Sequence, residues 1–187
     1  MNKIKSENQI LVMLAFFSIS MGLWENFRQL WLQDNSFTAT NISNILSIGT
    51  LISVLGIILV GKYIKLKNLR NLITCSLLIK FINLIVLLNL NNTTNVSIIN
   101  ISIIIDVLTG YVITTSIYPL ITTIVKSNTI YSKRKLTEYL FKDIGVLIGG
   151  VLIGKNIVGL LVNYNVCLLI SIIFLGISII FSCLISP

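Results

Sequence analysis

The sequence predicts an all-helical membrane protein with six transmembrane spans. The chain has 187 residues, of which 55% are hydrophobic and only 11% are charged, and its mean hydropathy is +0.96. A soluble domain usually carries about 25% charged residues, so this chain has too few charges to cover a water-facing surface. Its apolar residues also fall into runs of about 20, the length of a helix that crosses the hydrocarbon core. We therefore expect a single membrane domain over residues 1–187 and no large catalytic domain outside the bilayer.

The six apolar runs are expected to be helices. An open strand would leave backbone N–H and C=O groups unpaired in hydrocarbon, and the runs lack the alternating pattern of a membrane β-barrel. The first run is too long for the core of a signal peptide and has no small-residue cleavage site, so we expect it to be retained. The predicted spans cover residues 10–32, 42–60, 69–90, 98–125, 139–161 and 166–185.

The positions of the basic residues predict the orientation of the spans. Bases gather before the first run and in the connections after the second and fourth, whereas the connections after the first and third have none. The positive-inside rule then places the N-terminus in the cytoplasm, and six crossings return the C-terminus there. Lys155 is the exception, and its long side chain can reach the outer headgroups. The clusters are Lys3 and Lys5; Lys62, Lys65, Lys67 and Arg70; and Lys126, Lys133, Arg134, Lys135 and Lys142.

Composition and motifs exclude several classes of function. The net charge of +8 is explained by these topological clusters, so no nucleic-acid partner is expected beside the lipid bilayer. The chain has no histidine, and its three cysteines lie alone in apolar runs, so no metal or other cofactor is expected. Neither a Gly-x-x-x-x-Gly-Lys-Ser/Thr phosphate loop nor a Gly-x-Ser-x-Gly nucleophile elbow occurs, and we do not expect an enzyme.

Four ionisable residues lie inside the predicted spans: Glu25, Arg28, Lys80 and Asp106. A charge near the bilayer centre costs about 2.5 to 3.5 kcal/mol on insertion scales, so these residues need partners. At 1.5 Å per residue from the outer end of each helix, they come to similar depths and make a nearly neutral cluster of two acids and two bases. Glu25 and Arg28 are expected to pair on one helix face, as residues at i and i+3 can.

This cluster has a functional and a structural interpretation. In the first it binds substrate or a coupling ion, because a partly desolvated carboxyl beside a base can be tuned to bind and release a proton. In the second it forms ion pairs that only fix the register of the helices. Asn26 and Asn83 add amide groups in the same outer half and are further coupling candidates. Trp31 is expected to anchor the first span among the headgroups, where aromatic side chains gather.

Three local patterns have counterparts in a known family. The connection after the second span begins with Gly61 and carries several bases, including Lys65 and Arg70. Asp106 in the fourth span is followed by two spacers, a polar residue and Gly110. The fifth span is rich in glycine at four- and five-residue steps, which places small residues on one face where two helix backbones can approach. These glycines are Gly145, Gly149, Gly150 and Gly154.

Together with the six-span topology, these patterns resemble the N-terminal six-helix half of a major facilitator superfamily transporter. Lys65 stands where the family's signature loop has an acid, and Asp106 stands where its fourth helix has an arginine. The resemblance implies that the first and fourth helices face each other across a cavity, so that Arg28 and Asp106 form the family's charge pair with the signs exchanged. The glycines have two open interpretations, the family's motif and plain helix packing.

The resemblance implies a half or truncated secondary active transporter in the cell membrane that moves a small solute, with ion coupling expected. Such a half needs a partner, because the face that lines the cavity would otherwise meet lipid. The partner is expected to be a second six-helix half, encoded separately, or another copy of this chain. The alternative function is the integral-membrane substrate-binding component of a vitamin-type importer. A small-residue contact face on the first helix would favour that alternative, and we expect this helix to be bulky and charged instead.

Overall fold

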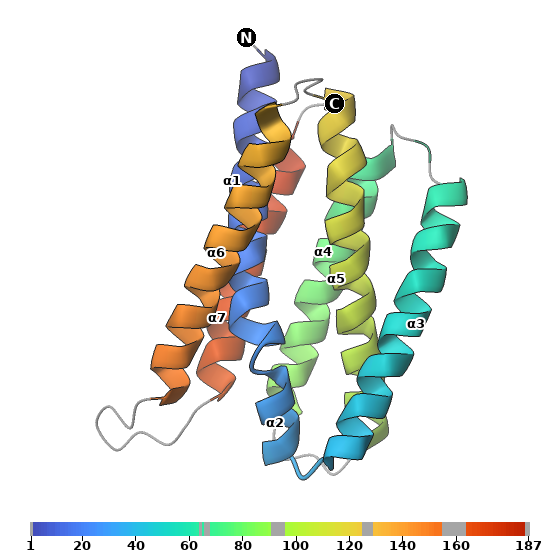
Figure 1. Cartoon of the computed structure of the whole chain (residues 1–187), viewed down its shortest axis with the longest axis vertical. Helices are drawn as coiled ribbons and strands as arrows, with labels where there is room; N and C mark the ends of the chain where they lie inside the picture. The colour runs from blue at the N-terminus through green and yellow to red at the C-terminus, as the bar shows by residue number, and fades with distance from the viewer. Residues whose placement is uncertain are drawn as a thin grey trace.

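The computed structural model describes residues 2–63, 65, 68–90, 96–124, 129–154 and 164–185. Within these ranges the regular elements are α-helices, with no strand, so the expected helical fold class is confirmed (Figure 1). The helices are α1 (Asn2–Glu25), α2 (Arg28–Asp34), α3 (Ala39–Tyr63), α4 (Leu69–Asn89), α5 (Val96–Ile124), α6 (Thr129–Gly154) and α7 (Tyr164–Leu184).

Among the described residues, five helical stretches are long and apolar enough to cross a membrane. They confirm the first, second, third, fourth and sixth predicted runs as helices of sufficient length. Large apolar side chains cover their outward faces, as a lipid-facing surface requires; Leu51 of α3, for example, is 64% exposed. The stretches are Ser6–Asp34, Ala39–Lys62, Leu69–Asn89, Val96–Thr123 and Tyr164–Leu184.

The helix that contains the described part of the predicted fifth span begins ten residues before that span. Its helix, α6, begins at Thr129 rather than at residue 139, because the charged segment expected to connect two spans is itself helical. Arg134 and Glu138 form an i,i+4 ion pair of 3.5 Å there, which supports a helical turn. Charges along α6 also keep it out of the five stretches that are apolar enough to span a membrane. Residues 155–161 of this prediction, with Lys155, lie outside the described residues, as do Lys67 and Lys126.

The predicted first span is divided by a short break between α1 and α2. At the break, the backbone N–H of Phe27 bonds the carbonyl oxygen of Trp24, three residues back, at 3.1 Å. The side-chain amide of Asn26 donates to the carbonyl oxygen of Gly22 at 3.3 Å. A side chain that bonds the preceding turn competes with the backbone ladder. Such an interruption inside an apolar run requires other groups to satisfy the freed backbone.

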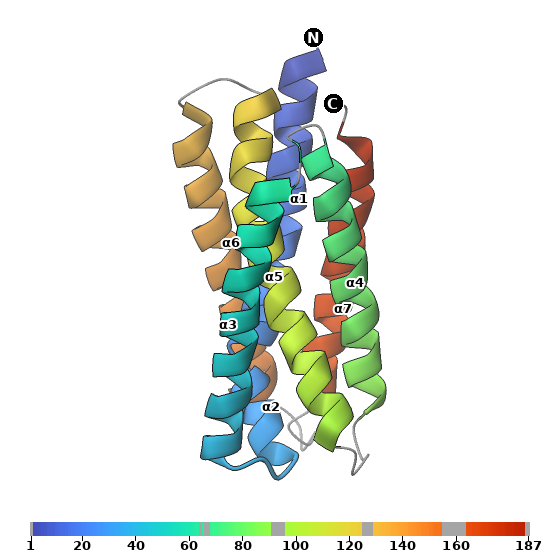
Figure 2. The same cartoon turned by 90° about the vertical axis from the view of Figure 1, so that its right-hand side faces the viewer.

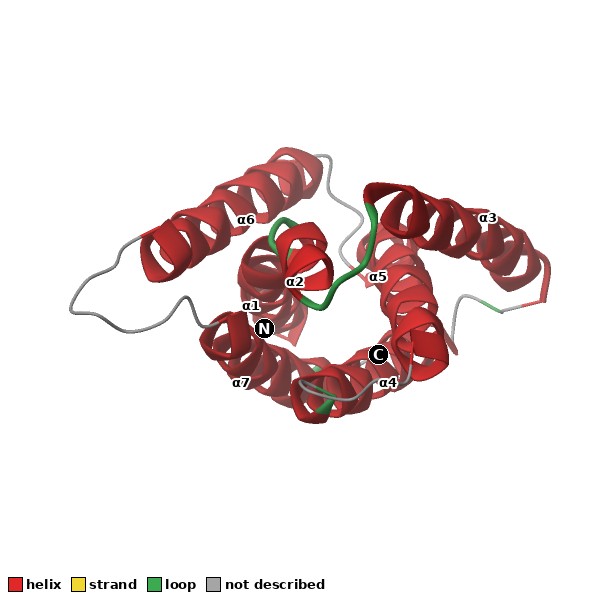
Figure 3. Ribbon diagram, turned by 90° about the horizontal axis from the view of Figure 1, so that it is seen from below, coloured by secondary structure: helices red, strands yellow, loops and turns green. Residues whose placement is uncertain are grey.

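The long helices form three pairs. α1 and α5 lie in the middle, α3 and α6 flank them on one side, and α4 and α7 lie on the other (Figure 3). α1 packs mainly on α6 and α7, whereas α5 packs mainly on α3 and α4, and α4 also packs on α7. α3 and α6 hardly touch each other over the described residues. The start of α1 and the end of α7 lie at the same end of the bundle, because the long helices alternate in direction (Figures 1 and 2).

This packing pattern repeats within the chain. Match α1 with α5, α3 with α6 and α4 with α7. The packing of α1 on α6 and α7 then corresponds to the packing of α5 on α3 and α4. The long helices alternate in direction, so matched helices run in opposite senses (Figure 2). The two three-helix units are therefore inverted relative to each other.

Glycines bring α1 and α6 into backbone contact. A Cβ atom on Gly22 would overlap the carbonyl oxygen of Lys142, and one on Gly145 would overlap the carbonyl oxygen of Ile19. The first helix therefore does present a small-residue contact, contrary to the expectation from its sequence. Its bulky side chains point elsewhere, and Gly22 is buried against α6.

The expectation that four glycines share one packing face of α6 is only partly correct. A Cβ on Gly149 would overlap the ring of Phe27, so this glycine also admits a close neighbour. Gly150 is exposed, with no atom near the position of a Cβ, because one further residue turns it about 100° away from that face. The surroundings of Gly154, the last residue of α6, are outside what the structure describes.

Candidate functional site

Asp106 is the centre of a buried charge cluster. It lies on α5 with its side chain fully buried, and its carboxylate accepts hydrogen bonds from three other elements. Lys80 Nζ of α4 donates to Oδ1 at 2.6 Å, while Arg28 Nη1 of α2 and Trp24 Nε1 of α1 donate to Oδ2 at 2.7 Å and 3.0 Å. Lys80 Nζ also donates to the backbone oxygen of Asp106 at 3.1 Å. The structure thus brings Arg28 and Asp106 together as the resemblance implied.

Glu25 forms the second half of the cluster and lies nearer to its surface. Its Oε1 is 3.9 Å from Lys80 Nζ, and its Oε2 is 3.6 Å from Lys142 Nζ on α6. A Cβ on Gly110, one turn beyond Asp106, would stand 3.3 Å from Glu25 Oε1 and 3.5 Å from Lys80 Nζ. The absence of a side chain at Gly110 therefore leaves room for the Glu25–Lys80 approach.

The expected ion pair between Glu25 and Arg28 is not among the salt bridges of the described residues. The two residues flank the break between α1 and α2, so the helical geometry that brings positions i and i+3 together is lost. Glu25 faces Lys80 and Lys142, whereas Arg28 faces Asp106. The break thus lets one short segment supply charges of both signs to different partners.

The partners of Asp106 explain how a carboxylate can remain ionised inside the bundle. An isolated buried ion loses several kcal/mol of hydration, and opposite charges offset this loss only when the geometry is good and the remaining lone pairs are bonded. Asp106 has two cations and an indole N–H within 3.0 Å. Lys80, only 1% exposed, is in turn shared by Asp106 and Glu25. Arg28 and Lys80 therefore balance the charges of Asp106 and Glu25, and Lys142 adds one further positive charge at the cavity.

A cavity of about 440 Å³ adjoins the cluster between α3 and α6. Glu25 and Arg28 reach it from the break in the first span, and Lys142 and Glu138 reach it from α6. Asp106 and Lys80 lie behind this lining. The remaining lining residues are Met21 of α1, Leu46 and Thr50 of α3, and Val107, Gly110, Tyr111 and Thr114 of α5.

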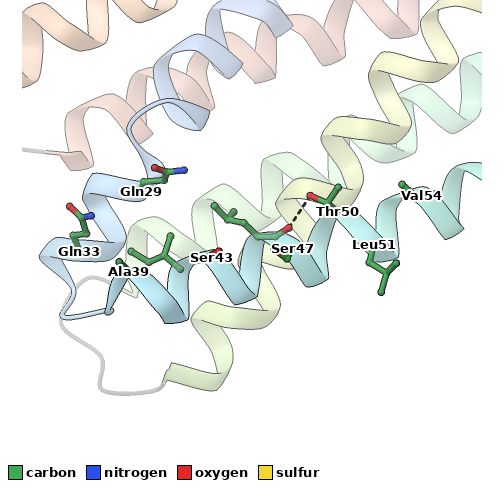
Figure 4. A pocket seen from close by; sticks show the side chains of 10 residues that line it. Gln29, Gln33, Ala39, Ser43, Ser47, Thr50, Leu51 and Val54 are labelled. Carbon is green, nitrogen blue, oxygen red and sulfur yellow. Dashed lines mark hydrogen bonds between the residues drawn. The ribbon is translucent and has the colours of Figure 1, made fainter.

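A second cavity of about 660 Å³ continues along α2 and α3. It shares Leu46 and Thr50 with the first cavity, so the two adjoin. Gln29 and Gln33 of α2 lie opposite hydroxyl-bearing side chains of α3 (Figure 4). The Thr50 hydroxyl donates to the carbonyl oxygen of Leu46 at 2.9 Å, drawn as a dashed line. Its lining has no charged residue; Ser43, Ser47, Ala39, Ile42, Leu51 and Val54 complete it.

The other coupling candidates lie apart from both cavities. Asn83 is buried and donates to the backbone oxygen of Ser102 at 2.8 Å, which ties α4 to α5. Asn26 is exposed, and its side-chain amide bonds the backbone at the helix break. In the connection after the second span, Gly61 and Lys65 are exposed. Arg70 donates to the carbonyl oxygen of Ile185 at 2.7 Å, which joins the start of α4 to the end of α7.

Both tryptophans of the first predicted span are buried, and the position of Trp31 differs from the expectation. Trp31 was expected among the headgroups, but it is 1% exposed and its ring packs edge-on against Trp24, with 5.7 Å between the centroids. The helix break explains this, because α2 turns Trp31 inward. Trp24 is the residue that the sequence analysis did not assign to the site. Its position next to Glu25 and four residues before Arg28 is the sequence signal that could have placed Trp24 in the site.

Lys142 and Gly110 were also missed as parts of the site. Lys142 had been counted with the basic cluster of a connection, and its place in the middle of a helix explains its contact with Glu25. In the part of the chain that the structure describes, no group of three or more histidine, cysteine or carboxylate side chains could hold a metal ion. Comparison of the chain with models of protein families, with curated proteins and with solved structures finds no match.

Proposed function

We propose that this chain is one six-helix half of a secondary transporter of the major facilitator type, with its solute site in the cavity beside Glu25 and Arg28. The observation that carries the proposal is the buried charge cluster that opens into a polar cavity between α3 and α6. Ionisable residues inside a membrane bundle mark substrate and ion pathways by default, because structural needs alone are met at lower cost by apolar packing.

Two features of the fold support this function. Inverted three-helix repeats are found within each half of major facilitator transporters, and the packing of this chain repeats in the same way. Transporter sites are also often built where a transmembrane helix is interrupted, and Glu25 and Arg28 flank such a break. In this proposal the basic clusters face the cytoplasm together with both termini.

Glu25 is the best candidate for the coupling group. It lines the cavity and lies between the buried Lys80 and the more exposed Lys142, whereas Asp106 does not line the cavity. A solute or proton in the cavity can therefore reach Glu25 directly, whereas Asp106 lies behind the lining. The Glu25–Lys142 contact joins α1 to α6 at the cavity, so a solute or proton that binds Glu25 competes with Lys142 for its carboxylate.

The open face between α3 and α6 requires a covering partner. Charged and amide side chains line the two cavities there, and groups of this kind are costly in contact with lipid. A second six-helix half, or another copy of this chain, would enclose them. The vitamin-importer alternative would use a small-residue face on the first helix that is free for a partner, but Gly22 is already buried against α6.

Cysteine labelling tests the proposed alternating access. Thr114 and Thr50 line the cavity, and each is replaced by cysteine in a chain whose exposed Cys75 and Cys183 are changed to serine. We expect both variants to react with a membrane-impermeant methanethiosulfonate in right-side-out and in inside-out vesicles, because a carrier's cavity opens alternately to each side.

A matched variant shows whether labelling requires a position that lines the cavity or only an exposed side chain. Ile82→Cys on α4 is 59% exposed but lines neither cavity, so it should stay unlabelled because the reagent requires an ionised thiol in water. Labelling of Thr114→Cys and Thr50→Cys from one side only, or from neither, would contradict the transporter proposal.

A further inference from the structure

We propose that the cavity binds a hydroxylated organic acid, whose carboxylate is held by Arg28 and whose polar body lies along α2 and α3. This inference rests on the proposed function, since it names the class of solute for the same site. Three independent features lead to it: the balance of charge around the cavity, the unused donors of Arg28, and the uncharged polar lining of the adjoining cavity.

The charge balance around the cavity favours an anion. The charged residues that line it, together with those ion-paired to them, comprise four cations and three carboxylates. Asp34 and Asp143 are exposed and line neither cavity. One positive charge is therefore left without a counterpart. The cations are Arg28, Lys80, Arg134 and Lys142, and the carboxylates are Glu25, Glu138 and Asp106.

Arg28 supplies the donors that such an anion needs. A guanidinium has five N–H donors, and within the described residues Arg28 makes one hydrogen bond, from Nη1 to Asp106. Its Nε is buried without a partner, although Arg28 lines the cavity with a side chain that is 12% exposed. The Nε and Nη2 hydrogens form the side-on fork that binds a carboxylate with two parallel hydrogen bonds. The bond from Nη1 to Asp106 holds the guanidinium and leaves the buried Nε of this fork without a partner, so a carboxylate in the cavity would satisfy it after a small rotation of the guanidinium.

The adjoining cavity selects the rest of the solute. Gln29 and Gln33 face Ser43, Ser47 and Thr50 across it, so amides and hydroxyls are available at successive positions along two helices (Figure 4). These groups can donate to and accept from hydroxyls, whereas a hydrocarbon chain would leave them without partners. The absence of charged residues from this lining places the charge of the solute at one end, beside Arg28.

Four soluble probes of similar size test the proposal on the purified full-length chain in detergent. Gluconate carries both an acid and hydroxyls, sorbitol lacks the acid, hexanoate lacks the hydroxyls, and meglumine replaces the acid with a cation. The melting temperature is measured against probe concentration at constant ionic strength. We expect a saturable increase with gluconate and at least about tenfold weaker apparent affinity for the other three. Sorbitol and meglumine lose the charge-assisted hydrogen bonds to Arg28, and hexanoate leaves the amides and hydroxyls of α2 and α3 without partners.

Two variants assign this binding to Arg28. Arg28→Lys keeps the positive charge and can still contact Asp106, but it removes the fork, so the affinity for gluconate should fall about tenfold or more. Lys133→Gln removes a base that is exposed and paired with Glu7 away from the cavities, so it should leave the affinity unchanged. If Arg28→Lys binds gluconate as well as the parent chain does, the proposed role of Arg28 is wrong.

The remaining outcomes would overturn the solute class. They are no saturable effect of gluconate, an equal effect of sorbitol or meglumine, and an equal effect of hexanoate. A shift with phosphatidylglycerol but not with gluconate would assign the cavity to a lipid headgroup instead. The labelling experiment uses no solute, so failure of the probes and failure of the proposed transporter can be told apart.

Discussion

Asp106→Asn is expected to lower the free energy of unfolding by about 3 to 5 kcal/mol, the usual cost of removing one member of a buried ion pair. The substitution leaves Arg28 and Lys80 without their shared anion, and Lys80 is only 1% exposed. The shape of the side chain is retained, so the effect reports charge rather than a cavity. We expect the melting temperature in detergent to fall by at least about 6 °C.

Two further variants show whether the loss comes from uncompensated cations. Lys80→Gln combined with Asp106→Asn should be more stable than the sum of the single changes predicts, because the second substitution removes a charge that the first has left unpaired. Asp143→Asn changes an exposed carboxylate on α6 and should leave the melting temperature nearly unchanged. Additive effects of the double change would mean that the buried ions do not interact as described.

Gly145→Ala is expected to destabilise the chain by about 1 to 3 kcal/mol, as overpacking of a close contact does. The new methyl group would overlap the backbone oxygen of Ile19, and a backbone atom cannot move aside as a flexible side chain can. α1 and α6 would have to separate, which would also disturb the Glu25–Lys142 contact between them. Thermal unfolding in detergent and the monodispersity of the purified variant measure the effect.

Gly150→Ala is the matched control on the same helix. A methyl group there enters open space, and alanine favours a helix over glycine by about 0.8 to 1 kcal/mol, so this variant should be as stable as the parent chain or more stable. Equal destabilisation by Gly145→Ala and Gly150→Ala would contradict the close approach of α1 and α6. The comparison also tests whether these glycines serve helix packing. If they do, alanine should destabilise the chain at Gly145, which contacts α1, and not at Gly150, where a Cβ atom meets no neighbour.

Composition and local pattern were enough to predict the helical class and the approximate place of most helices. In hydrocarbon a backbone must satisfy its own polar groups, so an apolar run of about 20 residues has essentially one solution. The gathering of Glu25, Arg28, Lys80 and Asp106 was predictable for a related reason. Isolated charges in a bundle are costly, and matched depths with opposite signs left them few other partners.

The start of α6 and the place of Trp31 could not be predicted in the same way. A hydropathy pattern places a boundary where charges begin, but a helix continues through charged residues when they pair along its face, as Arg134 and Glu138 do. The run from residue 10 to residue 32 contains Glu25, Asn26, Arg28 and Gln29 in its second half, but polar residues in an apolar run do not by themselves distinguish a continuous helix from a broken one. Because the sequence analysis did not predict the break, Trp31 was expected at the membrane–water interface, whereas it lies in the interior of the bundle.

The local sequence determined that the chain forms apolar helices and that a few ions must meet inside them, because residue type and position along an apolar run set the cost of leaving a charge unpaired. Which donor reaches which oxygen was decided only by the packing of helices that are distant in sequence. Trp24, Arg28 and Lys80 converge on Asp106 from three elements, and their directions depend on the helix break and on the contact of Gly22 with α6. Hydrogen bonds require atoms to meet within a few tenths of an ångström, and that precision arises only in the assembled bundle.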